Sequence, residues 1–117
     1  MYVIGFAPPM VGLEGEFNTF RIGGKWFKTL EVGMQVAILD EKNKRIVGYA
    51  EVTDLDKGQF KDMLEKHAYK NHSGLGATDL GAYILKIYGP HIVNDTKLTT
   101  VIYLRKLSDA RLEVKTI

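Results

Sequence analysis

The pattern of hydrophobic and polar residues predicts β-strands in five short stretches of the chain, some rich in β-branched and aromatic residues and others alternating with a period of two. The stretches cover residues 2–7, 17–22, 35–39, 45–52 and 98–107. Prolines, glycines or charged residues follow most of them, as expected where strands end in turns. We therefore expect strands to supply most of the core, with residues 108–117 adding an edge strand or a tail.

The period changes after residue 54, where apolar positions recur at the spacing of an α-helix. The first predicted helix has Asp56 as its N-cap, ends near Asn71 and carries an apolar stripe at Phe60, Met63, Leu64, His67 and Ala68. The second covers residues 79–88, with Thr78 as its N-cap and the Gly89-Pro90 pair beyond its end. Both helices are amphipathic, so each is expected to pack one face on the strands.

The expected order is four strands, two helices and a closing strand, without an internal repeat, a low-complexity segment or a linker. This order favours an α+β fold over a doubly wound sheet: a small mixed or antiparallel β-barrel flanked by two α-helices. The 117 residues fall in the commonest size range for one domain, so we predict a single domain over residues 1–117.

The composition adds several exclusions. The chain has no cysteine, which rules out disulfides and thiolate metal sites. His67 and His72 are five residues apart, a spacing that fits no metal-ligand motif, so we expect no metal and no cofactor. A net charge of +2 is too small to indicate nucleic acid by itself. Without a basic leader or a long apolar run, the chain is predicted to be cytoplasmic, with no membrane association.

The densest group of cations and aromatics lies beside the Gly23-Gly24 pair, at Arg21, Lys25, Trp26 and Lys28. One interpretation is a loop that binds a phosphorylated or nucleotide ligand, with Arg21 and Lys25 on phosphate and Trp26 stacked on a base. The other is a solvated turn that Trp26 fixes on the core. The segment is not a phosphate-binding loop of NTPases, because Trp26 follows Lys25 where that motif needs serine or threonine.

Two further side chains are candidates. Thr19 shares a strand face with Arg21 and is the one hydroxyl among polar strand residues next to the cationic loop. His67 lies on the apolar side of the first predicted helix, where a histidine is more often a hydrogen-bonded core residue than a catalyst.

The ordered segments of the chain resemble the ASCH domain, a small β-barrel with helices that is related to the PUA fold of RNA-binding proteins. The similarity covers about residues 14–106 and includes TFR, LEVGMQVAIL, RIVGYAEVTDL, LEKHA, KIYGP and TTVIYLRKL, in this order. It is strongest to the short bacterial ASCH proteins that act as amidohydrolases on N4-acetylcytidine. The resemblance implies a PUA-like fold and an RNA or nucleoside ligand.

The resemblance gives less support to catalysis. The amidohydrolases are thought to use a lysine, a threonine nucleophile and a glutamate after the first helix. Thr19 and Arg21 match the end of the family pattern, but the lysine position falls on Glu16 and the glutamate position on Asn71. Thr19 would then have no partner to take its proton, which a hydroxyl nucleophile requires.

We therefore predict an ASCH-type module that binds RNA or a modified nucleoside in a cleft between the barrel and the first helix. The expected ligand-binding residues are Thr19, Arg21, Lys25, Trp26, His67 and Asn71. One alternative is an amidohydrolase or ribonuclease with a rearranged active site, in which Thr19 acts with Glu16, Lys25 and His67. Another is a protein-binding adaptor, for instance one derived from a phage.

Overall fold

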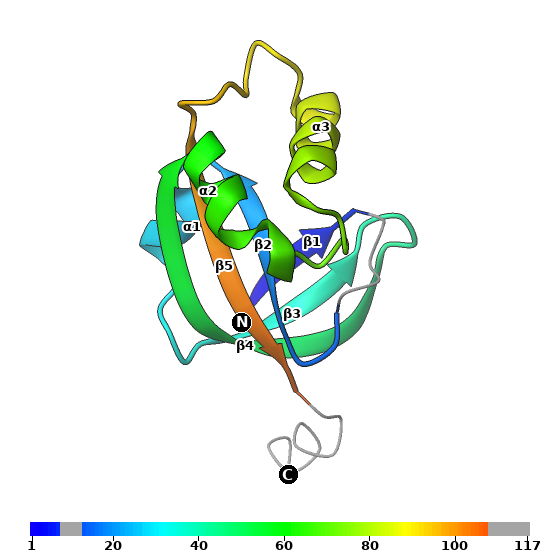
Figure 1. The fold of residues 1–117 in the computed structure, drawn as a ribbon. Coiled ribbons are helices and arrows are strands. Elements are labelled where there is room, and N and C mark those ends of the chain that lie inside the picture. Colours follow the sequence, from blue (N-terminus) through cyan, green and yellow to red (C-terminus); the bar gives the residue numbers. More distant parts are fainter. Residues whose placement is uncertain (8–12, 108–117) are drawn as a thin grey trace, which may run out of the picture.

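The fold is described by a computed structural model, which covers residues 1–7 and 13–107 (Figure 1). Five strands form one sheet: β1 (Tyr2–Phe6), β2 (Glu16–Ile22), β3 (Gln35–Asp40), β4 (Arg45–Gln59) and β5 (Leu98–Lys106). Their order is β1-β3-β4-β5-β2, with β1 parallel to β3 and every other pair antiparallel. The prediction of an α+β fold with a mixed sheet is confirmed.

The sheet curls into a half-barrel, so its two edge strands approach each other (Figure 1). The contact between the edges is made by a side chain: Arg21 on β2 donates a hydrogen bond from Nη2 to the carbonyl of Gly5 on β1, at 2.6 Å. We call this meeting of β1 and β2 the seam.

Three α-helices and a 3₁₀ turn accompany the sheet: α1 (Lys25–Thr29), α2 (Phe60–His67), η1 (Ala68–Lys70) and α3 (Ala77–Tyr88). The two predicted amphipathic helices correspond to α2, continued by η1, and to α3. The prediction of a loop at the cationic segment was wrong, because Lys25–Thr29 forms the short helix α1. None of its five residues breaks a helix, and Trp26 fixes it on the barrel core.

The predicted helix starts were also wrong. Strand β4 continues to Gln59, paired with β5 as far as Leu98, so Asp56 lies in a strand and Gln59 is the N-cap of α2. Cross-strand hydrogen bonds outweigh the local capping preference here. Helix α3 begins at Ala77 after Gly76, so Thr78 lies inside the helix. The predicted tail or edge strand at residues 108–117 lies outside the described residues.

Two apolar clusters hold the fold together. The first fills the barrel interior, with fully buried side chains from all five strands that include Ile4, Phe6, Phe17, Ile38 and Ile102. The second lies between the outer face of the sheet and the helices, and it includes Phe20, Phe60, Met63, Leu80 and Ile84. Successive residues of β2 alternate between the clusters, so this strand borders both. Among the described residues, no helix is long and apolar enough to cross a membrane.

Candidate functional site

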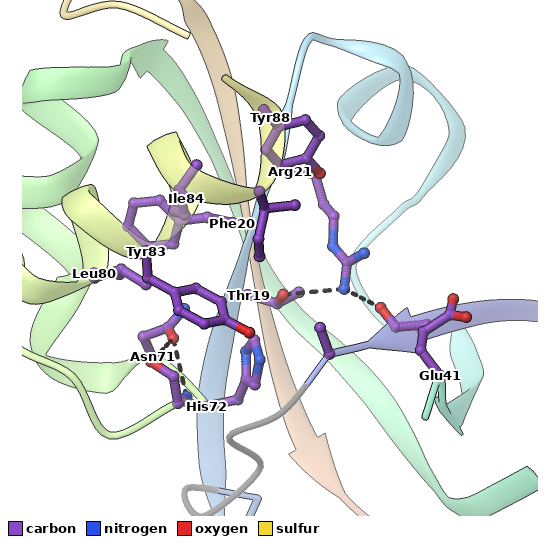
Figure 2. A pocket seen from close by; sticks show the side chains of 14 residues that line it. Thr19, Phe20, Arg21, Glu41, Asn71, His72, Leu80, Tyr83, Ile84 and Tyr88 are labelled. Atoms are coloured by element: carbon purple, nitrogen blue, oxygen red, sulfur yellow. Dashed lines mark hydrogen bonds between the residues drawn. The ribbon is translucent and has the colours of Figure 1, made fainter. Parts of the chain in front are cut away.

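A pocket of about 300 Å³ opens at the seam, between the edge strands and helix α3 (Figure 2). Its lining comes from β1, β2, the start of the β3–β4 turn, residues 71–73 and α3. The polar side of the pocket is formed by Thr19, Arg21, Glu41, Asn71, His72 and Ser73. The segments are far apart in sequence, so only the folded chain brings these side chains together.

Arg21 forms the charged floor of the pocket. Its Nη2 donates hydrogen bonds to the Gly5 carbonyl at 2.6 Å and to Thr19 Oγ1 at 3.2 Å, and its Cζ lies 5.3 Å from the centre of the Phe6 ring. Its Nε is buried and has no hydrogen-bond partner among the described residues. Burial lowers the pKa of Arg21, while Tyr88 and Glu41 raise it. The side chain stays charged, and one of its donors is unused.

His72 lies beside Arg21 on the polar side of the pocket. Burial, assisted by the charge of Arg21, lowers the pKa of its imidazole to about 4, while hydrogen bonding with the backbone of Asn18 and Ala7 opposes the shift. The ring is therefore neutral at pH 7. Its Nδ1 is buried without a partner in the part of the chain that the structure describes. The ring also packs edge-on against Phe6, at a centroid distance of 4.6 Å.

Asn71 shapes the segment that carries His72. Its Oδ1 accepts hydrogen bonds from the Ser73 backbone at 3.0 Å and from the Ser73 hydroxyl. The backbone N–H of His72 donates to the carbonyl of Asn18 at 2.9 Å, and this fixes the segment against β2. Asn71 lines the pocket, but these contacts assign it a positioning role.

Helix α3 provides the apolar side of the pocket. The apolar residues Leu80, Tyr83, Ile84 and Ile87 share one face of α3, and this face covers the pocket (Figure 2). This face is only partly buried, since Leu80 and Ile84 are buried while Ile87 is 52% exposed. Tyr88 lies at the rim next to Arg21 (Figure 2). The pocket thus combines two tyrosine rings with polar side chains, which suits a flat ligand with polar edges.

The structure separates two of the predicted ligand residues from this pocket. As far as the described residues define its lining, neither Lys25 nor Trp26 contributes. Trp26 packs against the barrel interior and lies edge-on to Tyr2, with ring centroids 6.0 Å apart. The structure does not bring Lys25 and Trp26 into one pocket with Arg21, because Arg21 turns into the seam while α1 covers another part of the barrel.

His67 is also outside the lining. Its Nε2 lies 2.7 Å from a carboxylate oxygen of Asp56, and its Nδ1 lies 2.7 Å from the hydroxyl of Tyr103. Its backbone carbonyl accepts a hydrogen bond from Asn18 at 2.8 Å. His67 therefore ties α2 to β4 and β5, which agrees with a hydrogen-bonded structural histidine. The helical side of the seam pocket is formed instead by residues 71–73 and α3.

Few of the described side chains at the pocket are placed to take part in catalysis. Glu16, at the position of the family's lysine, accepts a hydrogen bond from Thr53 at 2.9 Å and does not line the pocket in the described part of the chain. The hydrogen-bond partner of Thr19 is Arg21, which can only donate. Within residues 1–7 and 13–107, no group of three or more histidine and carboxylate side chains is arranged to hold a metal ion.

Several pocket residues were missed by the sequence interpretation. Glu41, His72, Tyr83 and Tyr88 line the pocket but were not among the predicted ligand-binding residues. One signal was available: Gly5 interrupts the apolar strand β1, and a glycine inside a strand often marks the close approach of another group. The aromatic residues of α3 carried no such signal, because a helical stripe facing a core and one facing a pocket have the same spacing.

Comparison with known proteins supports the fold. No protein-family model matches the sequence, and no curated protein matches it significantly. Solved structures do match: an ASCH protein from Zymomonas mobilis has a TM-score of 0.54 at 17% identity, over 96% of this chain and 76% of that chain. The ASCH domain from Lactobacillus crispatus has a TM-score of 0.55 at 9% identity, over 81% of this chain and 65% of that one.

A third structure, the hypothetical protein PH0355, is similar over 91% of this chain and 98% of its own, with a TM-score of 0.62 at 14% identity. Together these similarities show that the chain has the PUA-like fold of ASCH domains, as the sequence predicted. At such low identities the shared property is the fold. Function has to be argued from the pocket itself.

Proposed function

We propose that this protein is an ASCH-type module that binds the base of a modified nucleoside, either free or within RNA, in the pocket at the seam. The observation that carries the proposal is a cation, Arg21, that lines a pocket with aromatic side chains and whose buried Nε–H has no partner among the described residues. An unsatisfied buried donor costs about 1 to 3 kcal/mol, and a ligand acceptor would remove that cost.

The volume of the pocket suits a small ligand. A volume of about 300 Å³ lies at the lower end of the range for small-molecule sites. The rings of Tyr83 and Tyr88 offer faces on which a base can stack, and such stacking contributes about 1 to 3 kcal/mol per base. The polar side combines a cation, a carboxylate, an amide, a hydroxyl and a neutral imidazole, which matches the mixed donors and acceptors of a base edge.

The proposal concerns binding and not turnover. A threonine nucleophile needs a neighbouring base, and the partner of Thr19 is the guanidinium of Arg21, which cannot take a proton. The same hydrogen bond orients the guanidinium, so Thr19 supports the binding role of Arg21.

Calorimetric titration tests the proposal, with cytidine, N4-acetylcytidine and a short single-stranded RNA as ligands. The two sources of the base are distinguished by salt: RNA affinity should fall as salt rises, while affinity for an uncharged nucleoside should barely change. Arg21→Met removes the donors but keeps much of the side-chain length. Losing a hydrogen bond to a charged group costs about 1.5 to 3 kcal/mol, so we expect a loss of about 10- to 100-fold in affinity.

Lys25→Met is a matched control, because it removes a cation of the same charge from α1, outside the pocket. It should leave nucleoside affinity unchanged within about twofold. Melting temperatures of both variants show whether Arg21→Met has opened the seam, since Arg21 also binds the Gly5 carbonyl. Equal affinity of folded Arg21→Met and wild-type protein would refute the proposal, as would the absence of binding to every ligand.

A further inference from the structure

The carboxylate of Glu41 reaches the pocket because position 5 has no side chain. Glu41 begins the turn between β3 and β4, and its backbone N–H donates to the carbonyl of Phe6 at 3.1 Å. Its side chain then lies directly over Gly5, so closely that a Cβ added to Gly5 would overlap with the Glu41 carboxylate. The glycine in the apolar strand β1 thus provides the space that Glu41 occupies.

The carbonyl of Gly5 accepts the hydrogen bond from Arg21, so Gly5 contacts the guanidinium as well as the carboxylate of Glu41. Glu41 and Arg21 therefore flank the same residue, and both line the pocket (Figure 2). They are not joined by an ion pair: among the described contacts, the carboxylate of Glu41 pairs with Lys44 at 3.0 Å. That pair is largely exposed, so water competes with it and it contributes little. Both pocket charges can therefore interact with a ligand.

The charges of the pocket balance. Among the described lining residues, Arg21 is the one permanent cation and Glu41 the one carboxylate. His72 adds no charge at pH 7, because burial lowers its pKa to about 4. A site for phosphate usually gathers several donors or cations without a facing carboxylate. A carboxylate beside a guanidinium instead suits a neutral group that presents an N–H next to an acceptor atom.

We propose that Glu41 is a specificity-determining residue that restricts the pocket to uncharged base edges and excludes phosphate groups. This inference rests on the proposed function, since it names the part of a nucleoside that the pocket accepts. The carboxylate accepts an N–H of the ligand, Arg21 donates to the neighbouring oxygen or nitrogen, and a phosphate group is repelled by Glu41. A phosphate attached to the bound nucleoside, in a monophosphate or in RNA, is also repelled by Glu41 and weakens binding.

The test compares the dissociation constants of cytidine, cytidine 5′-monophosphate and inorganic phosphate by calorimetry. Wild-type protein should bind cytidine about tenfold more tightly than the monophosphate, and should not bind inorganic phosphate measurably. Glu41→Gln has the same shape without the charge, so the preference for cytidine should fall by about tenfold. Gly5→Ala should act in the same direction, because a Cβ at that position forces the carboxylate away.

Lys44→Met is the matched control, since it removes the exposed partner of Glu41 and leaves the pocket intact. Its preference should match that of wild-type protein within about twofold. A folded Glu41→Gln variant with unchanged preference overturns the inference while leaving nucleoside binding in place. A wild-type protein that binds phosphate as well as cytidine also overturns it. If no probe binds, the proposed function and the inference fail together.

Discussion

Helix α1 and the seam pocket both combine positive charge with aromatic rings, but they place the charge differently. On α1, Lys25 and Lys28 are not buried, and Trp26 packs inward on the barrel core. In the pocket, Arg21 is half-buried, and its Nε is fully buried without a partner among the described residues. Water satisfies an exposed ammonium, whereas a buried donor depends on the protein or on a ligand. Burial of this donor therefore distinguishes the proposed ligand site from the solvated cations of α1.

The largest expected effect is a loss of stability when Trp26 on α1 is truncated. Trp26→Ala removes a large ring from the edge of the barrel core, where such truncations cost about 3 to 5 kcal/mol when the ring is buried. We expect a loss near the lower value, measured by denaturant unfolding, because Trp26 is only partly buried. Affinity of the folded variant for nucleosides should stay within about twofold of wild type. A stable variant that has lost its affinity would assign the ligand to α1 instead.

The low pKa of His72 should make the stability of the protein depend on pH. Its pKa is about 4 in the folded protein and near 6.5 when unfolded, so the unfolded chain takes up the proton first as pH falls. The neutral ring's contribution to stability is present above pH 6.5 and is lost progressively down to about pH 4. Each pKa unit corresponds to about 1.4 kcal/mol, so the loss is about 3 kcal/mol.

Unfolding free energies measured between pH 4 and 7 check this, with His72→Gln as the comparison. The charged neighbour of His72 is Arg21, which keeps its charge over this range. The unfolding free energy of the variant should fall by about 3 kcal/mol less than that of the wild type as pH falls to 4, whatever its value at pH 7. Parallel curves for the two proteins would show that His72 is not buried beside the guanidinium.

The smallest effect is expected at Lys57, whose ammonium lies 4.6 Å from the centre of the Phe27 ring on α1. Exposed cation–π contacts contribute about 0.5 to 1 kcal/mol. Lys57→Met should therefore reduce the unfolding free energy by no more than this amount, without a change in nucleoside affinity. A larger loss would mean that this contact between β4 and α1 contributes more than an exposed cation–π pair does.

Much of the fold could be predicted from the sequence, because alternation and helical spacing are local properties. The strands and the two amphipathic helices were predicted on this basis. The failures have tertiary causes: pairing with β5 extends β4 through Asp56 to Gln59, and contact with the core makes a helix of Lys25–Thr29. A local capping or turn signal cannot report a partner strand that lies 40 residues away.

The site was only partly predictable for the same reason. Thr19 and Arg21 were found because they share a strand face, and Asn71 because of the family resemblance. Lys25 and Trp26 were grouped with Arg21 by proximity in sequence, which says nothing about the direction in which a side chain points. Glu41 and Tyr88 enter the pocket through the curl of the sheet and the placement of α3. Gly5 was the one local indication of that arrangement.

The central claim is that Arg21, and not the Trp26 region, contacts the ligand. NMR spectroscopy tests it directly by following two side-chain signals, the Nε–H of Arg21 and the indole N–H of Trp26, as cytidine or N4-acetylcytidine is added. We expect the Arg21 signal to shift and to exchange more slowly with water while the Trp26 signal stays in place. A shift of Trp26 with an unchanged Arg21 signal would contradict the account.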